Sequence, residues 1–531
     1  MFFPVKRTLF VLFTSVLSTL PLIADEPHSH HDHADLGNIG AASLPSSCTK
    51  TAQKEIDRGV TLIHSFWYSE AEAAFRRGVQ ADPKCGLAWW GIAMSNYHPL
   101  WAPPTPGELA TGREAAQKAR TIGAKTARER DYIDAINVFY DKLDSLDHRS
   151  RAVAFQNSME NVAARYPKDL EASIFYALSL NGTALPSDKT YANQRKAAEI
   201  LNRILPQAPE HPGIAHYVIH SFDYPALAQL ALPAARTYAK LAPGSPHALH
   251  MPSHIFTRLG LWDESISSNL ASADKARKYV AARRGPHVTA FDELHAIDYL
   301  VYAYLQQRRD ESRTLRDTLE RVTELDNPSF AAAYALGAVP ARYTMERRQW
   351  KEAAALRAPV FDWEKVPYAE ANVHFARSIG ASRSGDLELA RDGLARITLI
   401  RQQLVEQKNS YWADQVEIQR KSAEAWLRFA ENKKDKALEL MRQAADLESS
   451  TEKHPVTPGA VIPARELLAD LLLEMGRPDE ALVEVELSLR DSPNRWNGLF
   501  LASRAAELGG KLEKVSEYQA KMASLTRSKN M

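Results

Sequence analysis

The sequence predicts an all-α protein, an α-solenoid of antiparallel helical hairpins, and two observations carry this prediction. From about residue 50 to about residue 525, apolar residues recur at spacings of three and four, which is the period of an amphipathic helix. Short clusters of glycine, proline and aspartate interrupt the pattern, as at residues 81–83, 244–246, 384–386 and 476–479. Because such clusters end helices and turn the chain, we expect a series of helices joined by short loops.

Composition places the chain among folded, water-soluble proteins. It has 531 residues, of which 45% are hydrophobic and 25% are charged. Lysine and arginine total 66 against 65 aspartates and glutamates, so no net field favours a nucleic acid, and we expect no nucleic-acid partner. Only two cysteines are present, which excludes a disulfide-rich scaffold and a thiolate zinc cluster.

A secretion signal is predicted at residues 1–24. Lys6 and Arg7 precede an apolar run over residues 9–20, and the small Ala24 offers a cleavage site. The run is shorter than a membrane span, and no second apolar stretch of about 18 residues follows it. We therefore expect a periplasmic or secreted bacterial protein with no membrane span after cleavage. An uncleaved anchor is the alternative.

The predicted mature chain starts with a histidine-rich segment, which we expect to be a disordered tail over residues 25–47. Four imidazoles and three carboxylates fall within residues 25–33, and the histidines are His28, His30, His31 and His33. This set suits Zn(II), Cu(II) or Ni(II), because these metals favour nitrogen donors. Two interpretations stay open: a metal-capturing tail, or a solvated tail whose metal affinity is incidental.

The two cysteines follow this tail. Cys48 and Cys85 lie 37 residues apart, close to the length of one helical-hairpin repeat, so they fall at neighbouring helix starts. An oxidising compartment allows a disulfide between them. The alternative is a pair of buried thiols.

One segment of the chain carries a recognisable repeat motif. Residues 471–482 read LLLEMGRPDEAL, and Asp491-Ser492-Pro493 ends the helix that follows. The stretch resembles a tetratricopeptide repeat (TPR), with Gly476 ending the first helix and the small Ala481 allowing close helix contact. Comparable entries into a second helix occur at residues 69–71, 261–265, 349–353, 385–390 and 434–437.

The resemblance implies that residues 48–525 form a divergent TPR solenoid whose first helices line a concave groove. Residues 98–107 and 250–265 also resemble uncharacterised secreted bacterial TPR proteins. The leading prediction is an exported, non-catalytic scaffold that binds a protein or peptide partner in this groove and requires no cofactor. A closed toroid of paired helices, as in some glycan-processing enzymes, is the weaker alternative.

A histidine pattern repeats at a spacing of 34 residues. Pro212, His216, His220 and Phe222 recur as Pro246, His250, His254 and Phe256. Histidines four residues apart share one helical face, and equal spacing brings the two pairs side by side. The four imidazoles can complete a four-coordinate Zn or Cu site. Pro252 lies within the second pair, and we expect it to kink that helix and separate its histidines.

Further polar residues are expected beside these pairs in the groove: His64, His98, Asp223, His295 and Asp298. His295 is a candidate ligand from the next repeat, and the two aspartates are candidates for orienting metal ligands. Three interpretations stay open for the histidines: structural hydrogen bonds, contact with a peptide or other ligand, or a metal-binding or metal-delivery function fed by the tail.

No catalytic motif accompanies these residues. The chain has neither a phosphate-binding loop nor a nucleophile elbow. Tyr217 and Met251 follow the first histidine of each pair, where helical zinc proteases have glutamate. We therefore assign no catalytic residue.

Overall fold

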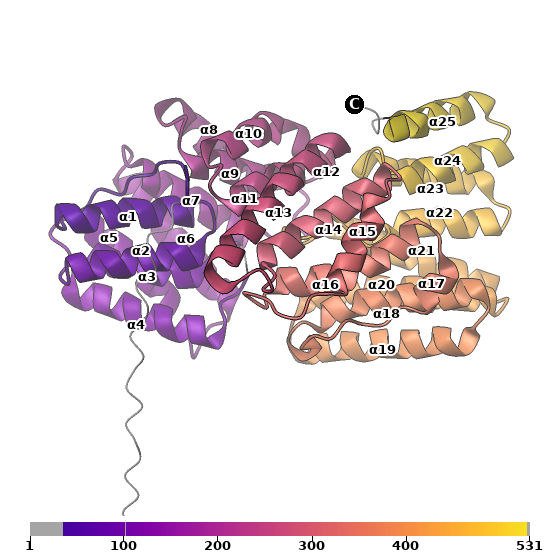
Figure 1. Cartoon of the computed structure of the whole chain (residues 1–531), viewed down its shortest axis with the longest axis horizontal. Coiled ribbons are helices and arrows are strands. Elements are labelled where there is room, and N and C mark those ends of the chain that lie inside the picture. The colour runs from indigo at the N-terminus through magenta and orange to yellow at the C-terminus, as the bar shows by residue number, and fades with distance from the viewer. Residues whose placement is uncertain (1–35, 101, 528–531) are drawn as a thin grey trace, which may run out of the picture. The chain divides into compact units, whose positions relative to one another are not determined.

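The structure is a computed structural model that describes residues 36–100 and 102–527. Within these residues the chain is helical and forms no β-strand (Figure 1). Every described helix belongs to one compact unit that begins at Gly37. None of these helices is both long and apolar enough to cross a bilayer. The predicted signal peptide and the tail histidines His28, His30, His31 and His33 lie outside the described residues.

Short loops connect the helices in order along the chain. The first are α1 (Lys50–Ile63), α2 (Tyr68–Ala81), α3 (Gly86–Tyr97), α4 (Pro106–Ile122), α5 (Ala127–Tyr140), α6 (His148–Arg165), α7 (Leu170–Thr183), α8 (Ala192–Ile204) and the 3₁₀-helix η1 (Leu205–Gln207). Next are α9 (Pro212–Phe222), α10 (Ala228–Leu241), α11 (Pro246–His250), α12 (Pro252–Arg258), α13 (Trp262–Arg284), α14 (Phe291–Gln306), α15 (Glu311–Leu319), α16 (Phe330–Glu346), α17 (Trp350–Ala354) and η2 (Trp363–Lys365). The last are α18 (Pro367–Ser384), α19 (Leu387–Glu406), α20 (Ser410–Ala430), α21 (Lys434–Ser450), α22 (Ala464–Glu474), α23 (Pro478–Asp491), α24 (Trp496–Leu508) and α25 (Leu512–Arg527).

Helices that are neighbours in the sequence pack against each other. Examples are α1 on α2, α3 on α4, α18 on α19 and α20 on α21, and alternate helices such as α16 and α18 also touch (Figure 1). Gly476 adopts a φ of +72° just beyond α22, as the repeat motif predicted, and α23 then begins at Pro478. The predicted all-α class and the helical-hairpin architecture of TPR-like repeats are therefore confirmed.

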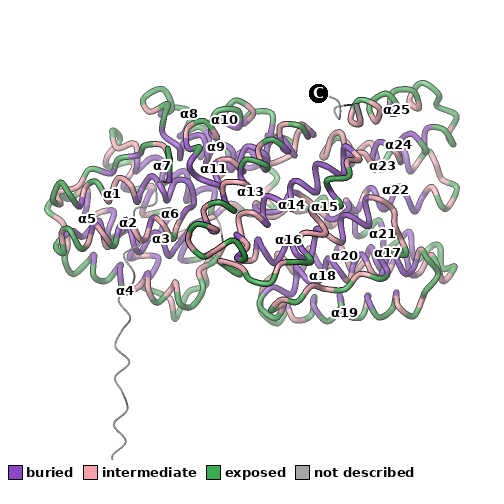
Figure 2. Tube along the Cα trace, viewed as in Figure 1, coloured by how far each residue is buried: buried purple, intermediate pink, exposed green. Residues whose placement is uncertain are grey.

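Several central helices are buried along almost their whole length. Every residue of α9 is buried, as are nearly all residues of α7, α14 and α16 (Figure 2). A helix that is apolar on all sides is typical of a protein interior. The polar side chains that α9 and α14 carry therefore lie away from solvent and need partners inside the protein.

Residues 38–47 are packed onto the helices. The carbonyl oxygen of Asn38 accepts a hydrogen bond from the Gly244 amide at 2.7 Å, and the Ala42 amide donates to Thr61 Oγ1 at 3.0 Å. Leu44 is fully buried. The predicted disordered tail of residues 25–47 is therefore wrong at this end, because these residues find backbone partners and apolar contacts.

The loop between α21 and α22 contacts residues far away in the sequence. Glu452 Oε1 accepts hydrogen bonds from Lys189 Nζ at 2.7 Å and from the Tyr191 hydroxyl at 2.8 Å. Lys453 Nζ lies 2.8 Å from Asp223 Oδ2. The loop thus joins α21 to the segments that flank α8 and α9.

Cys48 and Cys85 form a disulfide, with their Cα atoms 5.3 Å apart. Cys48 precedes α1 and Cys85 precedes α3, so the bond links two neighbouring helix starts, and neither thiol remains free.

Replacing both cysteines with serine is expected to destabilise the protein by about 4 kcal/mol, because the disulfide closes a loop of 37 residues and so lowers the conformational entropy of the unfolded chain. Thermal unfolding with and without a reductant measures the effect. Reductant should lower the unfolding temperature of the native chain and leave that of the serine variant unchanged. If the native chain and the serine variant unfold at the same temperature, with and without reductant, the disulfide does not stabilise the protein.

Candidate metal centre

Four helices bring six histidines together in the interior. His216 and His220 lie on α9, His247 and His250 on α11, His254 on α12 and His295 on α14. Pro212 and Pro246 occupy the first turns of α9 and α11, where a missing N–H costs no hydrogen bond. Each helix therefore starts at a defined residue, which fixes the register of its histidines.

Pro252 interrupts the second histidine pair without separating it. α11 ends at His250 and α12 starts at Pro252, and Met251 between them keeps helical dihedrals of −53° and −34°. The Nε2 atoms of His250 and His254 lie 3.0 Å apart. The predicted separation is therefore wrong, because a proline at the start of a helix preserves the turn that precedes it.

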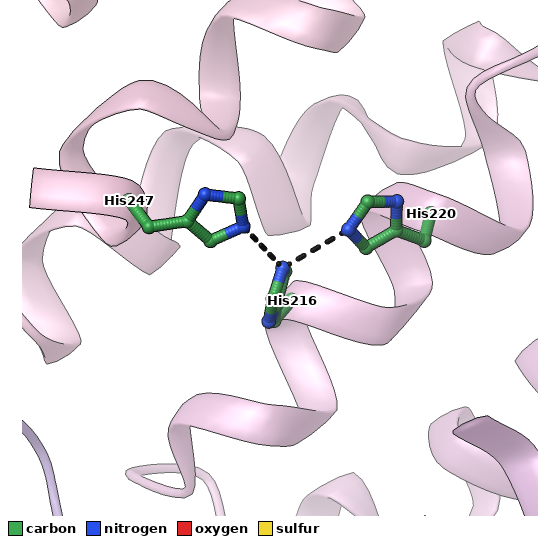
Figure 3. A group of neighbouring side chains, drawn as sticks. All are labelled: His216, His220 and His247. Carbon is green, nitrogen blue, oxygen red and sulfur yellow. Dashed lines mark hydrogen bonds between the residues drawn. The ribbon is translucent and has the colours of Figure 1, made fainter. Parts of the chain in front are cut away.

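The first group, trio A, consists of His216, His220 and His247 (Figure 3). His216 Nε2 lies 3.1 Å from His220 Nε2 and 3.2 Å from His247 Nε2. His216 Nδ1 donates to the carbonyl oxygen of His64 at 2.7 Å, so its Nε2 carries a lone pair. One lone pair accepts one hydrogen bond, yet two imidazole nitrogens face it.

The second group, trio B, consists of His250, His254 and His295. The Nε2 atoms of His250 and His254 lie 3.0 Å apart, and the ring centroids of His250 and His295 lie 4.2 Å apart. In each trio, one ligand nitrogen from each histidine lies within 4.8 Å of the other two. Trio B therefore converges on one point much as trio A does.

Hydrogen bonds fix the tautomers of two histidines in trio B. Asn269 Nδ2 donates to the Ser265 carbonyl, so its Oδ1 accepts from His250 Nδ1 at 2.6 Å. His254 Nδ1 donates to Asp223 Oδ2 at 3.0 Å. Both Nδ1 atoms carry the proton, so both Nε2 atoms carry lone pairs. These two lone pairs face each other at 3.0 Å.

All six imidazoles are buried, with relative exposures between 0% and 8%. Burial lowers the pKa of each one and brings that of His216 to about 3. The others with a lowered pKa are His220, His247, His250, His254 and His295. Neutral imidazole is therefore the stable form at neutral pH, and a shared proton does not relieve the facing lone pairs.

A metal ion bound between the nitrogens would relieve this repulsion. Two nitrogens bound at 2.0–2.1 Å to a tetrahedral metal lie about 3.3 Å apart, close to the 3.0–3.2 Å separations in both trios. Histidine ligands in metal sites donate their second N–H to a carboxylate or carbonyl. His216, His250 and His254 each do so.

Asp223 links trio B to the rest of the protein. Its carboxylate accepts from His254 Nδ1 and lies 2.8 Å from both Arg258 Nε and Lys453 Nζ. Burial raises the pKa of Asp223, but Lys453 and Arg258 outweigh it and keep the carboxylate ionised. Burial lowers the pKa of Lys453 to about 8.

A third group consists of His64, Glu171 and His211. One ligand atom from each of these residues also lies within 4.8 Å of the other two. His211 Nδ1 accepts from the Gly213 amide, and its Nε2 donates to Glu171 at 2.9 Å. His64 Nε2 lies 2.8 Å from the other Glu171 oxygen, and its Nδ1 lies 2.9 Å from the Tyr217 hydroxyl. Each polar atom already has a partner, so this group is a hydrogen-bond network that supports trio A through the His64 carbonyl.

The other predicted groove residues lie outside the trios. His98 Nδ1 contacts the Ala102 carbonyl at 2.8 Å, and its Nε2 lies 3.3 Å from Glu108. Asp298 forms a buried ion pair with Arg342. The prediction that the histidines line an open groove is wrong for trios A and B, because helix packing covers them.

Three residues that belong to the trios or pack on them were not identified from the sequence. His247 completes trio A, and its spacing of three residues from His250 was the available signal. Phe66 packs on trio A, with its ring centroid 4.4 Å from that of His216, and its φ is +53°. Tyr299 stacks on His254 at 5.0 Å, and its hydroxyl lies 3.3 Å from His254 Nε2.

Comparison with known proteins adds no functional assignment. No family model and no curated protein matches the chain. Among solved structures, a human IFIT1 dimer with PPP-AAAA has a TM-score of 0.40 at 12% identity, covering 83% of this chain and 90% of its own. A structure of Naa15/Naa10 bound to HypK-THB has a TM-score of 0.23 at 12% identity, covering 89% and 63% respectively. At these TM-scores the likenesses bear on neither site nor partner.

Asp298→Asn is expected to destabilise the protein by about 3–5 kcal/mol, because it leaves the buried Arg342 guanidinium without its ion pair. Asp274→Asn, which breaks an exposed ion pair with Lys278, should cost less than about 1 kcal/mol. Urea unfolding compares the two. An unaltered midpoint for Asp298→Asn would contradict the structural role given to this residue.

Proposed function

We propose that the protein binds transition-metal ions, Zn or Cu, in its buried histidine cluster. One observation carries this proposal: the Nε2 lone pairs of His250 and His254 face each other at 3.0 Å, while both Nδ1 atoms donate elsewhere. A cation between the two nitrogens removes the repulsion. Imidazole is a preferred ligand of both Zn and Cu.

Each part of the surroundings has a role in this proposal. The Nε2 atoms bind the metal, and the partners of the Nδ1 atoms hold the rings in place. These partners are the His64 carbonyl, Asn269 and Asp223. Three protein ligands per ion leave a coordination position open. Phe66 and Tyr299 cover the two trios with apolar ring faces, which keeps bulk water away.

We also propose that the protein works in an oxidising, exported compartment. The predicted signal peptide supports this, and so does the Cys48–Cys85 disulfide, since such bonds persist mainly outside the cytosol. In that setting the histidine-rich residues 25–33 would collect metal ions for the interior site.

His254→Ala is expected to abolish high-affinity metal binding at trio B, and Asn269→Ala to weaken it about 10- to 100-fold by freeing the His250 ring. Titration with Zn(II) followed by calorimetry measures both effects. His287→Ala is the matched control, because the His287 side chain is 69% exposed and lies outside both trios. Equal affinities in all three variants would contradict a metal site at trio B.

A second candidate function is partner binding, which an aromatic pocket favours. A cavity of about 430 Å³ is lined by residues including Tyr368, Trp412, Lys453 and His454. The Tyr368 and Trp412 rings stack at 4.0 Å, and Trp412 stacks on His454 at 5.2 Å. This size and this wall suit a planar side chain of a peptide partner.

The charges of the pocket point to an acidic partner. Arg149 and Lys453 line it. Lys453 is paired with Asp223, and the single carboxylate of the lining, that of Glu452, is bound by Lys189, which leaves Arg149 as the cation without an acidic partner among the described ion pairs. We therefore propose that the partner presents an aromatic ring beside a carboxylate, as a C-terminal phenylalanine does.

N-acetylphenylalanine should bind the native protein at least 10-fold more tightly than its amide, because Arg149 attracts the carboxylate. Trp412→Ala should remove this binding, while Trp496→Ala, which lies outside the pocket, should retain it. Ligand-observed NMR measures the affinities. Equal binding of acid and amide, or full binding by Trp412→Ala, would contradict the proposal.

A further inference from the structure

Trios A and B adjoin each other. The short helix α11 supplies His247 to trio A and His250 to trio B, three residues apart. The ring centroids of these two histidines lie 6.1 Å apart, and those of His220 and His254 lie 6.0 Å apart. The two trios therefore touch through two pairs of rings, and metal ions held by them would be neighbours.

Both trios are electrically neutral and buried. All six ligands are imidazoles, which bind a metal ion as neutral rings. The adjoining carboxylate, that of Asp223, is matched by Arg258 and Lys453, which both lie 2.8 Å from it. Behind trio A, the Glu171 carboxylate bonds His64 and His211, neither of which belongs to a trio. The two ligand sets therefore carry no negative charge of their own to compensate a buried cation.

This charge balance discriminates between metals. The desolvation free energy of an ion rises with the square of its charge, so two divalent ions are far more costly to bury than two monovalent ions. Among metals that imidazole binds well, copper has a stable monovalent state. Cu(I) also tolerates three nitrogen ligands, the number that each trio provides.

Aromatic rings close the centre on two sides. Phe66 stacks on His220 and His247 of trio A at 5.4 and 5.3 Å. The ring centroid of Tyr299 lies 4.7 Å from that of His250 in trio B. Phe66 is held at a φ of +53°, an uncommon conformation for a bulky residue, and such strain gathers at functional sites. The rings surround the imidazoles with low-polarity material.

We propose that trios A and B form a single two-copper centre that holds two Cu(I) ions side by side, each on three imidazoles. The proposal rests on the metal-binding function above and adds the metal, its oxidation state and the number of ions. Removal of one electron from each ion by an external oxidant gives two Cu(II) ions. Neighbouring Cu(II) ions couple magnetically, which distinguishes one shared centre from two separate sites.

The test uses the full chain with its four tail histidines replaced by alanine, so that only the interior binds copper. The protein is loaded anaerobically with Cu(I), freed of excess metal, and oxidised with two equivalents of ferricyanide. We expect two copper ions per chain and the loss of most of the Cu(II) electron paramagnetic resonance intensity that two isolated ions would give. His247→Ala should leave one copper ion with full signal intensity, as should His295→Ala. His287→Ala should behave as the parent.

Three outcomes overturn the proposal. One copper ion per chain in the parent excludes two sites, and two ions with full signal intensity exclude a shared centre. In both cases the metal-binding function stands. If the parent binds neither copper nor zinc, the metal-binding function fails as well. A folded His247→Ala variant, verified by circular dichroism, ensures that its copper content reports on the ligand and not on unfolding.

Discussion

The hydrogen bonds made by histidine Nδ1 atoms determine what the interior of this protein can do. His216 donates to a backbone carbonyl, His250 to Asn269 and His254 to Asp223. Each bond turns an Nε2 lone pair toward another imidazole nitrogen at 3.0–3.2 Å. In trio B both facing nitrogens carry lone pairs, so the bonds that orient these rings also leave their Nε2 atoms available as ligands.

Packing and buried polar contacts around the two trios hold the histidine rings in these orientations. Helix α9 is buried on every side, so its histidines have only protein partners. The network of His64, Glu171 and His211 lies behind trio A, while Asp223, Arg258 and Lys453 lie behind trio B. Lys453 comes from the loop that joins α21 to α22, and it also lines the aromatic pocket. A ligand in the pocket would therefore contact the residue that holds Asp223 against His254.

The sequence predicted the helical hairpins and the paired histidines, because both depend on local spacing. The spacing of 34 residues placed α9 and α11 correctly, and Gly476 marked a helix end. Burial, by contrast, depends on contacts between segments that are distant in the sequence. The histidines were therefore expected to line a groove, although they lie in the interior. The spacing of three residues from His250 marked His247, but only the contact between its ring and His216 assigns it to trio A. Arg342 and Asp298 are 44 residues apart, so their ion pair carries no local signal.

X-ray absorption at the metal edge can show whether buried histidines bind the metal, because it reports the atoms in the first coordination shell. The measurement uses the metal-loaded full chain with its tail histidines replaced by alanine. We expect about three nitrogen ligands at roughly 2.0 Å, with the multiple scattering that imidazole rings produce. A first shell dominated by oxygen, or metal that dissociates once the tail histidines are removed, would contradict it.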